Sequence, residues 1–570
     1  MSSPLWKRCA LALAIAAPAL STLFLVIYSG RIPHHDYWGI QQKFFSASGF
    51  SAEPRDWFIA TRAHFMPLTY LLYAANIVAT KGSNLGLSGM TWMFAGIQTA
   101  LLVKLARAGG LGGWWPAAIA AFCFTLCAAE PWLMGFSGVP NVGSQTLSIA
   151  SIYCLGQPRM SRASAQTALG LGLALLAGFT FSTGLPACLI AILALVWGGA
   201  KRRWILAAVV SAALLFALRS TMVAAFYAPR PAPSIRIPDP TAAAHYGLAL
   251  MGGIFSQTIE IGSALAFMGI AAAGYAGWQA RKDPRARPWI LLLLLSLAQA
   301  GLITLGRWDQ GPLQAIASRY SPIPALFWLA TFVLLALLAH HRASRAVLAI
   351  LVVAAVVAMS TVGWGYNRSL LYRASLQSGA RLSVRYKVPD AELIQLTVTP
   401  WTSGFLSSQR ALSVHGLVPF DRPLEAEWGS MRADLLHAPP DRQGGATLAL
   451  HRFRERGLRM MLQLPDHTGS ILLVNEHGVI RGAAEPLVFA PYEQVVWLGY
   501  ARVEPKDQLI RVVRIPDVAE ADRPVQLAAY PLAALPVDGR GLQVFKRVRE
   551  LPREHHAGRR LFPPRFSARD

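Results

Sequence analysis

One polar stretch, residues 31–65, concentrates the side chains best suited to acid–base chemistry, and it directly follows an apolar segment. Its titratable candidates are His34, His35, Asp36, Glu53, Asp56, Arg62 and His64. Three of the eight acidic residues that precede position 367 therefore lie in this stretch. Carboxylates close to a membrane are costly and usually functional. We therefore expect a catalytic loop here, with Asp36 as the general base for an incoming hydroxyl group.

Two later segments add charged candidates between apolar runs: EPWLMGF at 130–136 and GRWDQGPLQAIASRY at 306–320. The planar guanidinium group of arginine matches the oxygen geometry of a phosphate. Arg307 and Arg319 are therefore predicted to bind a phosphate. With the loop, these segments supply the predicted substrate-binding residues His35, Arg62, His64, Glu130, Arg307, Asp309, Arg319 and Tyr320.

The candidate base also has a structural interpretation. Asp36 precedes a run with helical spacing of aromatic and aliphatic residues, 37–45. The aspartate could simply cap a short amphipathic helix that lies flat on the membrane. The neighbouring histidines could instead join Asp36 in binding a divalent metal. The expected chemistry requires no cofactor, and no metal ligand is assigned.

The late-loop candidates have structural interpretations as well. Arg307 could form an exposed salt bridge with Asp309, which would contribute little. Arg319 could extend its side chain toward the membrane surface, and Tyr320 could be an interfacial anchor. Glu130 precedes Pro131 at the end of an apolar run, where a structural role is equally compatible.

Composition indicates a membrane protein. Of the 570 residues, 54% are hydrophobic and 14% are charged, whereas a soluble domain has about 25% charged residues. The net charge of +24 results from scarce acids and from Lys and Arg grouped in short loops, as in the cytoplasmic loops of membrane proteins. Nucleic-acid binding is therefore not expected.

Eleven apolar runs of about 17–22 residues are candidates for membrane-spanning helices. They are residues 9–29, 87–106, 114–130, 139–156, 166–182, 184–200, 204–226, 261–280, 289–305, 321–339 and 346–366. The first run follows Lys7 and Arg8 and is long enough to span, so we expect a retained signal anchor.

The basic clusters determine the predicted topology. They all fall on the cytoplasmic side if residues 67–80 form an interfacial or re-entrant helix that does not cross. The N-terminus is then cytoplasmic, the loop 30–66 is external, and the chain leaves the membrane near residue 366 on the outside. Every acid before 367 except Asp283 then lies at or near the outer face.

The composition changes after Asn367, where 21 of the 29 acidic residues lie. We expect a mixed connecting region at 367–440, a small β-rich domain at 441–552 that folds as a sandwich, and a disordered basic tail at 553–570. The predicted strands are Ala446–Leu450, Met460–Leu464, Ile471–Val474, Val495–Tyr500, Leu509–Ile515 and Leu542–Val548.

The motifs HHDYW at 34–38 and RAHF at 62–65, with FSTGLP at 181–186 and the two later segments, resemble those of a known group. Residues 9–366 are similar to bacterial polytopic membrane proteins related to GT-C-type glycosyltransferases. In that group an Asp-Tyr-Trp motif opens the first external loop and a Gly-Arg…Ser-Arg-Tyr motif lies in a late loop.

The resemblance implies a multi-pass protein of the bacterial inner membrane with a periplasmic C-terminal domain. It also implies a polyprenyl-phosphate sugar donor, membrane lipid around the protein, and an envelope glycan or lipid acceptor on the periplasmic face. The chain departs from the group at two points. Two histidines precede Asp36 where paired acids are common, and Ala63-His64-Phe65 replaces a Glu-His-Arg type of motif. The resemblance therefore assigns neither a second catalytic carboxylate nor a metal site.

Two other functions are compatible with the sequence. A transporter of lipid-linked saccharide would be expected to carry charges inside its spans and paired broken helices, and the sequence has almost no mid-span charge. A non-catalytic envelope assembly or scaffold protein could use the β-rich domain to bind partners. The chain has no Walker motif, so direct coupling to ATP is not expected.

Overall fold

The computed structural model describes residues 5–46, 49–51, 64–156, 164–227, 238–388, 390–397, 409–421, 428–440, 446–453, 457–464, 469–487, 495–516 and 523–535. The site candidates Glu53, Asp56 and Arg62, the predicted strand 542–548 and the tail from 553 lie outside these residues. The chain forms two compact units. The first comprises Met1–Ala374 and Ser403–Asp421, and the second comprises Ser375–Thr402 and Arg422–Asp570.

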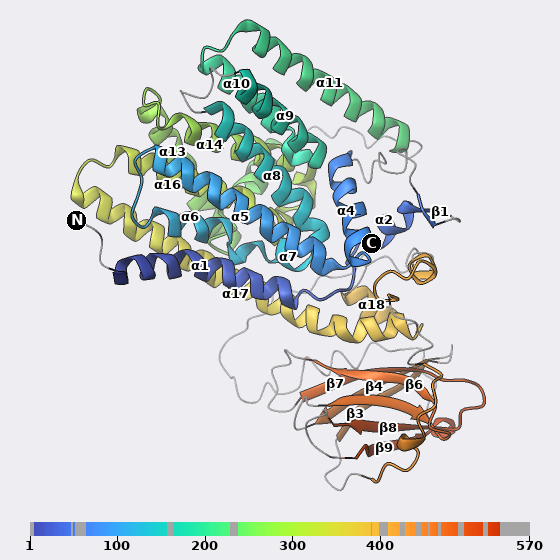
Figure 1. Ribbon diagram of the computed structural model, residues 1–570. Helices are drawn as coiled ribbons and strands as arrows, with labels where there is room; N and C mark the ends of the chain where they lie inside the picture. Colours follow the sequence, from blue (N-terminus) through green and yellow to red (C-terminus); the bar gives the residue numbers. More distant parts are fainter. Residues whose placement is uncertain are drawn as a thin grey trace. The chain divides into compact units, whose positions relative to one another are not determined.

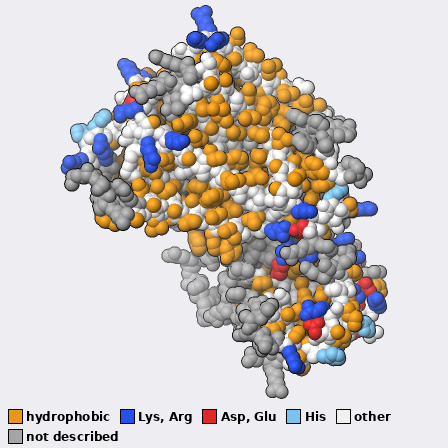
Figure 2. Space-filling model, viewed as in Figure 1, with side chains coloured by type: hydrophobic (Ala, Val, Ile, Leu, Met, Phe, Trp, Pro, Cys, Tyr) orange, Lys and Arg blue, Asp and Glu red, His pale blue; other side chains and the backbone are white. Residues whose placement is uncertain are grey.

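The first unit is helical (Figure 1). Its longer helices are α1 (Leu5–Tyr28), α4 (Pro67–Thr80), α5 (Asn84–Ala108), α6 (Trp115–Cys123), α8 (Gly135–Gly156), α9 (Ser164–Thr180), α10 (Pro186–Trp197), α11 (Arg202–Tyr227), α12 (Pro240–Gly252), α13 (Ile259–Ala280), α14 (Arg287–Arg307), α16 (Pro322–Leu338) and α17 (Arg342–Arg385). Hydrophobic side chains cover the face of this unit that Figure 2 shows. Such a surface is expected of a unit that contacts lipid.

Ten of the eleven predicted spans lie largely on one α-helix each, whereas the run 114–130 covers α6, the 3-10 helix η2 (Leu126–Ala128) and the start of α7 (Ala129–Leu133). The predicted number of spans is not confirmed. Seven helical segments among the described residues are long and apolar enough to cross a membrane. Three further apolar helices, α9, α10 and α16, are shorter. Helix α8 is largely buried and carries many polar residues, and Pro140 lies inside it. Its polar groups bond to neighbouring helices, for example where the Gln145 amide donates to Pro322 O at 2.8 Å.

Helix α14 defines two ends of this unit, because its first and last residues, Arg287 and Arg307, are about 30 Å apart at 1.5 Å per residue. At the Arg287 end, called the basic end here, Arg287 donates to Ala194 O, and Arg285 pairs with Asp283 at 2.8 Å. The opposite end, called the site end, holds the loop after α14.

Helix α4 begins and ends at the site end. Thr69 Oγ1 in its first turn donates to Thr180 O at 2.6 Å, and Tyr73 OH donates to Phe136 O. Just after the helix, Asn84 Nδ2 donates to Leu133 O at 2.9 Å. At 14 residues, α4 is not among the candidate spans of the described residues. That residues 67–80 do not cross stays a prediction.

The first part of the polar loop is packed inside the protein. It forms α2 (Tyr37–Gln41), η1 (Gln42–Phe44) and a hairpin of β1 (Phe45–Ser46) and β2 (Gly49–Phe50). Tyr37 and Trp38 have at most 2% of their surface exposed, so the prediction of an amphipathic helix lying flat on the membrane is wrong. The reason is that the loop packs onto α4, where the Asn76 amide donates to Tyr37 OH at 3.1 Å.

Residues 409–421, called the return segment here, come back to the first unit after the chain has entered the second. Arg31 pairs with Asp421 at 2.6 Å, and the ring of His415 stacks on Phe45 with centroids 4.2 Å apart. Val418 N–H donates to Lys81 O at 3.0 Å. These contacts hold the return segment against the polar loop and the end of α4.

The second unit contains one seven-stranded antiparallel sheet, which Figure 1 shows in orange and red. Its strands, in sheet order, are β3 (Ala446–Phe453), β4 (Gly457–Leu464), β7 (Val495–Arg502), β6 (Ile480–Pro486), β5 (Ser470–Asn475), β8 (Leu509–Ile515) and β9 (Val525–Pro531). The prediction of a β-rich unit is confirmed for the described residues, but the sandwich prediction is wrong.

Both faces of the central strands are buried. On one face Leu458 and Trp497 belong to an apolar core that the curved sheet encloses. On the other face the end of α17 and α18 (Ala391–Thr397) cover the sheet, and Gly379 of α17 packs against Leu498. A second sheet is therefore not needed to bury the strands.

A buried carboxylate in this unit predicts how its stability depends on pH. Arg481 and Asn475 each donate to Asp507 at 2.8 Å, and none of the Asp507 side chain is exposed. Burial alone would raise the pKa of the Asp507 carboxyl, but these hydrogen bonds and the Arg481 charge hold the pKa below its usual value.

A carboxyl whose pKa is lower in the folded than in the unfolded state stabilises the fold at pH values above the unfolded pKa of about 4. This stabilisation is lost as the pH falls through the lower pKa of the folded state. We therefore expect the second unit to lose stability in acid, and Asp507→Asn to remove part of that acid dependence. Hydrogen exchange of β5 and β8 between pH 3 and pH 7 measures this. Equal acid slopes in both proteins would contradict the assignment.

Candidate functional site

An ion pair at the site end joins two segments that lie 189 residues apart in the sequence. Arg319, in η5 (Ser318–Tyr320), donates from Nη1 to both carboxylate oxygens of Glu130, at 3.2 and 3.4 Å. Glu130 lies in α7 (Ala129–Leu133), and its backbone N–H donates to Ser318 Oγ. Burial would lower the pKa of Arg319, but the Glu130 carboxylate and Tyr320 raise it. The guanidinium therefore stays charged.

The Gln314 amide connects both predicted phosphate arginines. Gln314 lies in α15 (Pro312–Ala315), and its O and N atoms are assigned from the donors and acceptors around them. Its oxygen accepts from Arg307 Nη1 at 3.2 Å, from Arg319 Nη2 at 3.0 Å and from Tyr320 OH at 2.9 Å. Its nitrogen donates to the hydroxyl of Tyr246 in α12. Two guanidinium groups therefore converge on one amide oxygen.

Arg307 has no carboxylate within ion-pair distance among the described residues. In particular, the alternative of a salt bridge to Asp309 is wrong within the described structure, because no such pair forms and the Asp309 side chain is exposed. Asp309 still acts electrostatically on Tyr246, together with both arginines. Burial raises the pKa of the Tyr246 hydroxyl, so it remains protonated at neutral pH.

Tyr320 is part of this polar cluster. Only 5% of its surface is exposed, so the alternative of an interfacial anchor is wrong. The centroid of its ring lies 5.0 Å from the guanidinium carbon of Arg319 and 6.0 Å from that of Arg307. Cation–π contacts of this length attract a cation to the ring face. Tyr320 therefore helps to hold the two arginines side by side.

Asp36 occupies the N-cap position of α2, but its side chain makes no capping hydrogen bond. The residue before it, His35, has a φ of 47°, a left-handed conformation that is uncommon outside glycine. The Asp36 charge acts on Tyr73 of α4, whose pKa is raised mainly by burial. The structure therefore does not support a role for Asp36 as a side-chain helix cap, and it places a strained residue directly beside the candidate base.

The histidines of the loop are not clustered around a metal site in the described residues. His34 is buried with 2% exposure, and the ring centroid of His35 lies 6.0 Å from that of Phe136. No group of three or more possible metal-ligating side chains occurs among the described residues.

His64 lies in a second polar group at the site end. Its Nδ1 is 2.7 Å from Ser182 Oγ, and Arg219 Nη2 donates to the same oxygen at 2.9 Å. Ser182 lies in η3 (Ser182–Gly184) and Arg219 lies in α11. Burial and the charges of Arg219 and Arg307 lower the pKa of His64 to about 4. The charge of Arg307 therefore acts both on His64 and on Tyr246.

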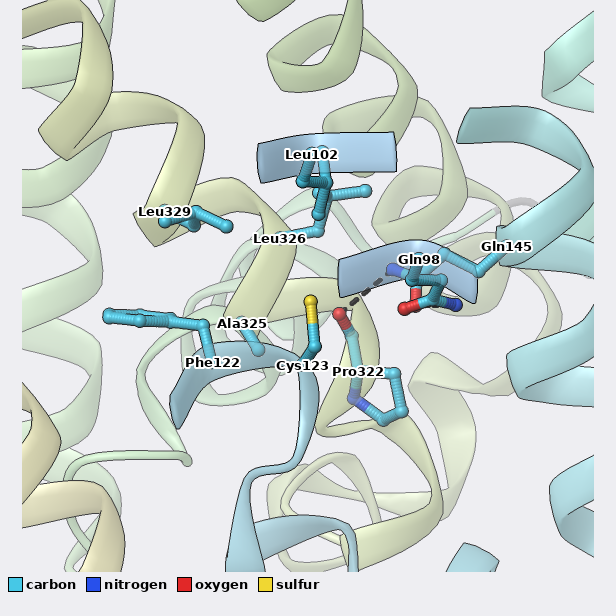
Figure 3. A pocket seen from close by; sticks show the side chains of 9 residues that line it. All are labelled: Gln98, Leu102, Phe122, Cys123, Gln145, Pro322, Ala325, Leu326 and Leu329. Carbon is cyan, nitrogen blue, oxygen red and sulfur yellow. Dashed lines mark hydrogen bonds between the residues drawn. The ribbon is translucent and has the colours of Figure 1, made fainter. Parts of the chain in front are cut away.

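A small pocket lies inside the helical unit, among α5, α6, α8 and α16 (Figure 3). Gln98 and Gln145 face it beside Cys123 and apolar side chains. Its free volume of about 10 Å³ is only about enough for one water molecule. It is too small for a sugar or a phosphate and is no candidate for the substrate site.

The structure thus brings Glu130, Arg307, Arg319 and Tyr320 into one cluster, with His64 electrostatically coupled to it through Arg307. Asp309 acts on the same cluster through Tyr246. Asp36 and His35 lie beside α4 and Phe136. Arg62 is outside the described residues.

Sequence reasoning missed four residues of these groups: Ser182, Arg219, Tyr246 and Gln314. Ser182 and Gln314 lie inside two of the motifs that carry the resemblance, but nothing in the motifs distinguishes them from their neighbours. Arg219 was detectable as an arginine inside an apolar segment, which is rare and usually functional.

Comparison with family models, with curated proteins and with solved structures gives no match to this chain.

Proposed function

We propose that the protein is a membrane glycosyltransferase that moves a sugar from a polyprenyl-phosphate donor to an envelope glycan or lipid acceptor on the periplasmic face. The observation that carries this proposal is the pair of arginines joined by Gln314, of which only Arg319 has a carboxylate partner among the described residues. Arg307 thus brings to the end of an apolar helical unit a positive charge that no carboxylate of the described residues pairs with. A phosphate on a lipid brings negative oxygens to this depth.

The distribution of charge along the helical unit supports the proposed sidedness. Loops at the basic end carry Lys201 to Arg203 and Arg281 to Arg287, and basic loops favour the cytoplasm. The Arg281 guanidinium lies 3.7 Å from the ring centroid of Trp278, which is exposed, as expected at a membrane interface. The site end is then periplasmic, where polyprenyl-linked sugars would be used.

In the proposed mechanism, Arg307 and Arg319 hold the phosphate and stabilise the charge that develops on it as the sugar leaves. The hydroxyls of Tyr246 and Tyr320 orient the two guanidinium groups through Gln314. Asp36 accepts the proton of the acceptor hydroxyl as its oxygen bonds to the sugar.

Phosphate binding tests this proposal without knowledge of the sugar. The purified protein in detergent should bind farnesyl phosphate more tightly than farnesol, which has the same chain without the phosphate. Arg307→Gln should weaken farnesyl phosphate binding by about 10- to 100-fold, because it removes a charged hydrogen-bond donor, and should leave farnesol binding unchanged.

Arg285→Gln is the matched control, because Arg285 lies at the basic end and pairs with Asp283. It should bind both compounds as the wild type does. If the wild type does not distinguish farnesyl phosphate from farnesol, the phosphate site does not exist and a scaffold function becomes the better explanation.

A further inference from the structure

His64 belongs to a hydrogen-bond chain whose direction is fixed by Arg219. Arginine can only donate hydrogen bonds, and a serine hydroxyl has one hydrogen to donate. Arg219 donates to Ser182 Oγ at 2.9 Å, and the other group near this oxygen among the described residues is His64 Nδ1 at 2.7 Å. The hydroxyl hydrogen therefore finds an acceptor only if it points to Nδ1, which makes Nδ1 the acceptor.

The ring must then carry its own hydrogen on the other nitrogen. Burial and the positive charges of Arg219 and Arg307 lower the pKa of His64 to about 4, so the imidazole is neutral at pH 7. In a neutral imidazole, the nitrogen that does not accept carries the hydrogen. His64 is therefore held in the Nε2–H form by Arg219 and Ser182.

The Nε2–H group is not used by the hydrogen bonds of His64 within the described residues. His64 as a residue is partly exposed, and its Nε2 has no hydrogen-bond partner in the described part of the chain. Its ring is held in place by Phe181, with centroids 4.8 Å apart. Arg307, whose charge acts on His64, also bonds to Gln314 in the arginine cluster. The donor thus lies within electrostatic range of the proposed phosphate ligand Arg307.

We propose that His64 is a further ligand of the phosphate, donating from Nε2–H, and that Ser182 and Arg219 are positioning residues that maintain this tautomer. The inference rests on the proposed function, because the phosphate is the one that Arg307 and Arg319 bind. A neutral donor stabilises charge that develops on the leaving phosphate without adding another fixed positive charge beside two arginines. The site for the phosphate then extends from η5 to the start of α4.

Paired substitutions at His64 separate this role from packing. His64→Phe keeps an aromatic ring against Phe181 but removes the donor, and His64→Gln loses the ring but keeps an N–H group. We expect His64→Phe to bind farnesyl phosphate about tenfold more weakly than the wild type, and His64→Gln to stay within about threefold. A role in packing alone predicts the opposite order.

The positioning residues are tested with the same probes. Ser182→Ala should weaken farnesyl phosphate binding about threefold, because the tautomer is no longer fixed, and Ser182→Thr should restore binding. The control is Ser148→Ala on α8, a buried serine whose hydroxyl donates to Ser144 O one turn earlier and to no other described residue. Farnesol binding should be unchanged in all of these variants.

The two proposals fail in different ways. If the wild type prefers farnesyl phosphate over farnesol but His64→Phe and Ser182→Ala bind it equally well, the phosphate site stands and the role of His64 is rejected. If the wild type shows no preference, the proposed function itself is rejected. The melting temperature of each variant in detergent shows whether it is folded. If one variant of a pair is misfolded, the binding measured for the folded variant of that pair tests the role of His64.

Discussion

Asp36→Asn is expected to reduce sugar transfer by about 100-fold or more, because a positioned general base contributes about 10²- to 10⁴-fold to a rate. Asparagine keeps the shape of the side chain but cannot accept the proton. Transfer from a panel of polyprenyl-phosphate sugars, measured in membranes that contain equal amounts of each protein, gives the rate. Farnesyl phosphate binding should stay unchanged, because the arginines hold the phosphate.

Asp239→Asn is the matched control, since Asp239 also precedes a helix at the site end. Unlike Asp36, it caps its helix: its Oδ1 accepts from Thr241 N–H at 3.0 Å. Asparagine caps a helix as well as aspartate does, so this variant should behave as the wild type. Glu130→Gln is the informative comparison. If Asp36→Asn transfers sugar at the wild-type rate and Glu130→Gln does not transfer it, Glu130 rather than Asp36 is the general base.

Asp390→Ala is expected to lower the free energy of unfolding of the second unit by about 3–5 kcal/mol, because it leaves a buried arginine without its main partner. Arg459 donates to Asp390 at 2.8 Å, and each side chain has 1% of its surface exposed. Tyr500 OH also donates to Asp390 at 2.5 Å, and Leu393 N–H donates to its other oxygen. The substitution removes all three hydrogen bonds.

Asp434→Ala provides the exposed counterpart within the same unit. Asp434 pairs with Arg432 at 2.6 Å, but both side chains are almost half exposed. Such pairs contribute about 0–1 kcal/mol. Hydrogen exchange of β4 and β7 in the full-length protein measures both variants. A loss for Asp390→Ala no greater than that for Asp434→Ala would show that the buried network is not a stabilising centre.

The helices of the first unit were predictable because their signal is local. A run of about twenty apolar residues in a membrane has few alternatives to a helix. The number of spans was not predictable in the same way. Helix α8 interrupts its apolar run with Pro140 and buried polar groups such as Gln145, which are satisfied only by neighbouring helices. Such partners cannot be read from the segment itself.

In the candidate site, likewise, some residues could be identified from the sequence but their contacts could not. Residue type alone identified Arg307, Arg319 and Glu130, because charges are rare in this part of the chain. Their pairing was not predicted, since Glu130 and Arg319 meet across 189 residues. Gln314 has an ordinary polar side chain in a short motif, and only its position between two arginines makes it distinctive.

In the second unit, the alternation of apolar and polar residues predicted most of the strands but did not predict how the sheet packs. Five of the predicted strands occur, whereas β6, IRGAAEP, and β9, VQLAAYP, were missed because small and polar residues weaken the alternating pattern. The sandwich prediction assumed that a buried second face needs a second sheet. Here α18 and the end of α17 cover that face, and the chain supplies them from before the first strand.

The return segment has a practical consequence for any attempt to separate the two units. Because residues 403–421 belong to the first unit although 375–402 belong to the second, neither unit is one continuous stretch of chain. A single stop codon near residue 366 or 400 would delete the partner that Asp421 provides for Arg31 and the ring that His415 stacks on Phe45. Exchanging the second unit with that of another protein would therefore require three junctions: one before residue 375 and one on each side of the return segment.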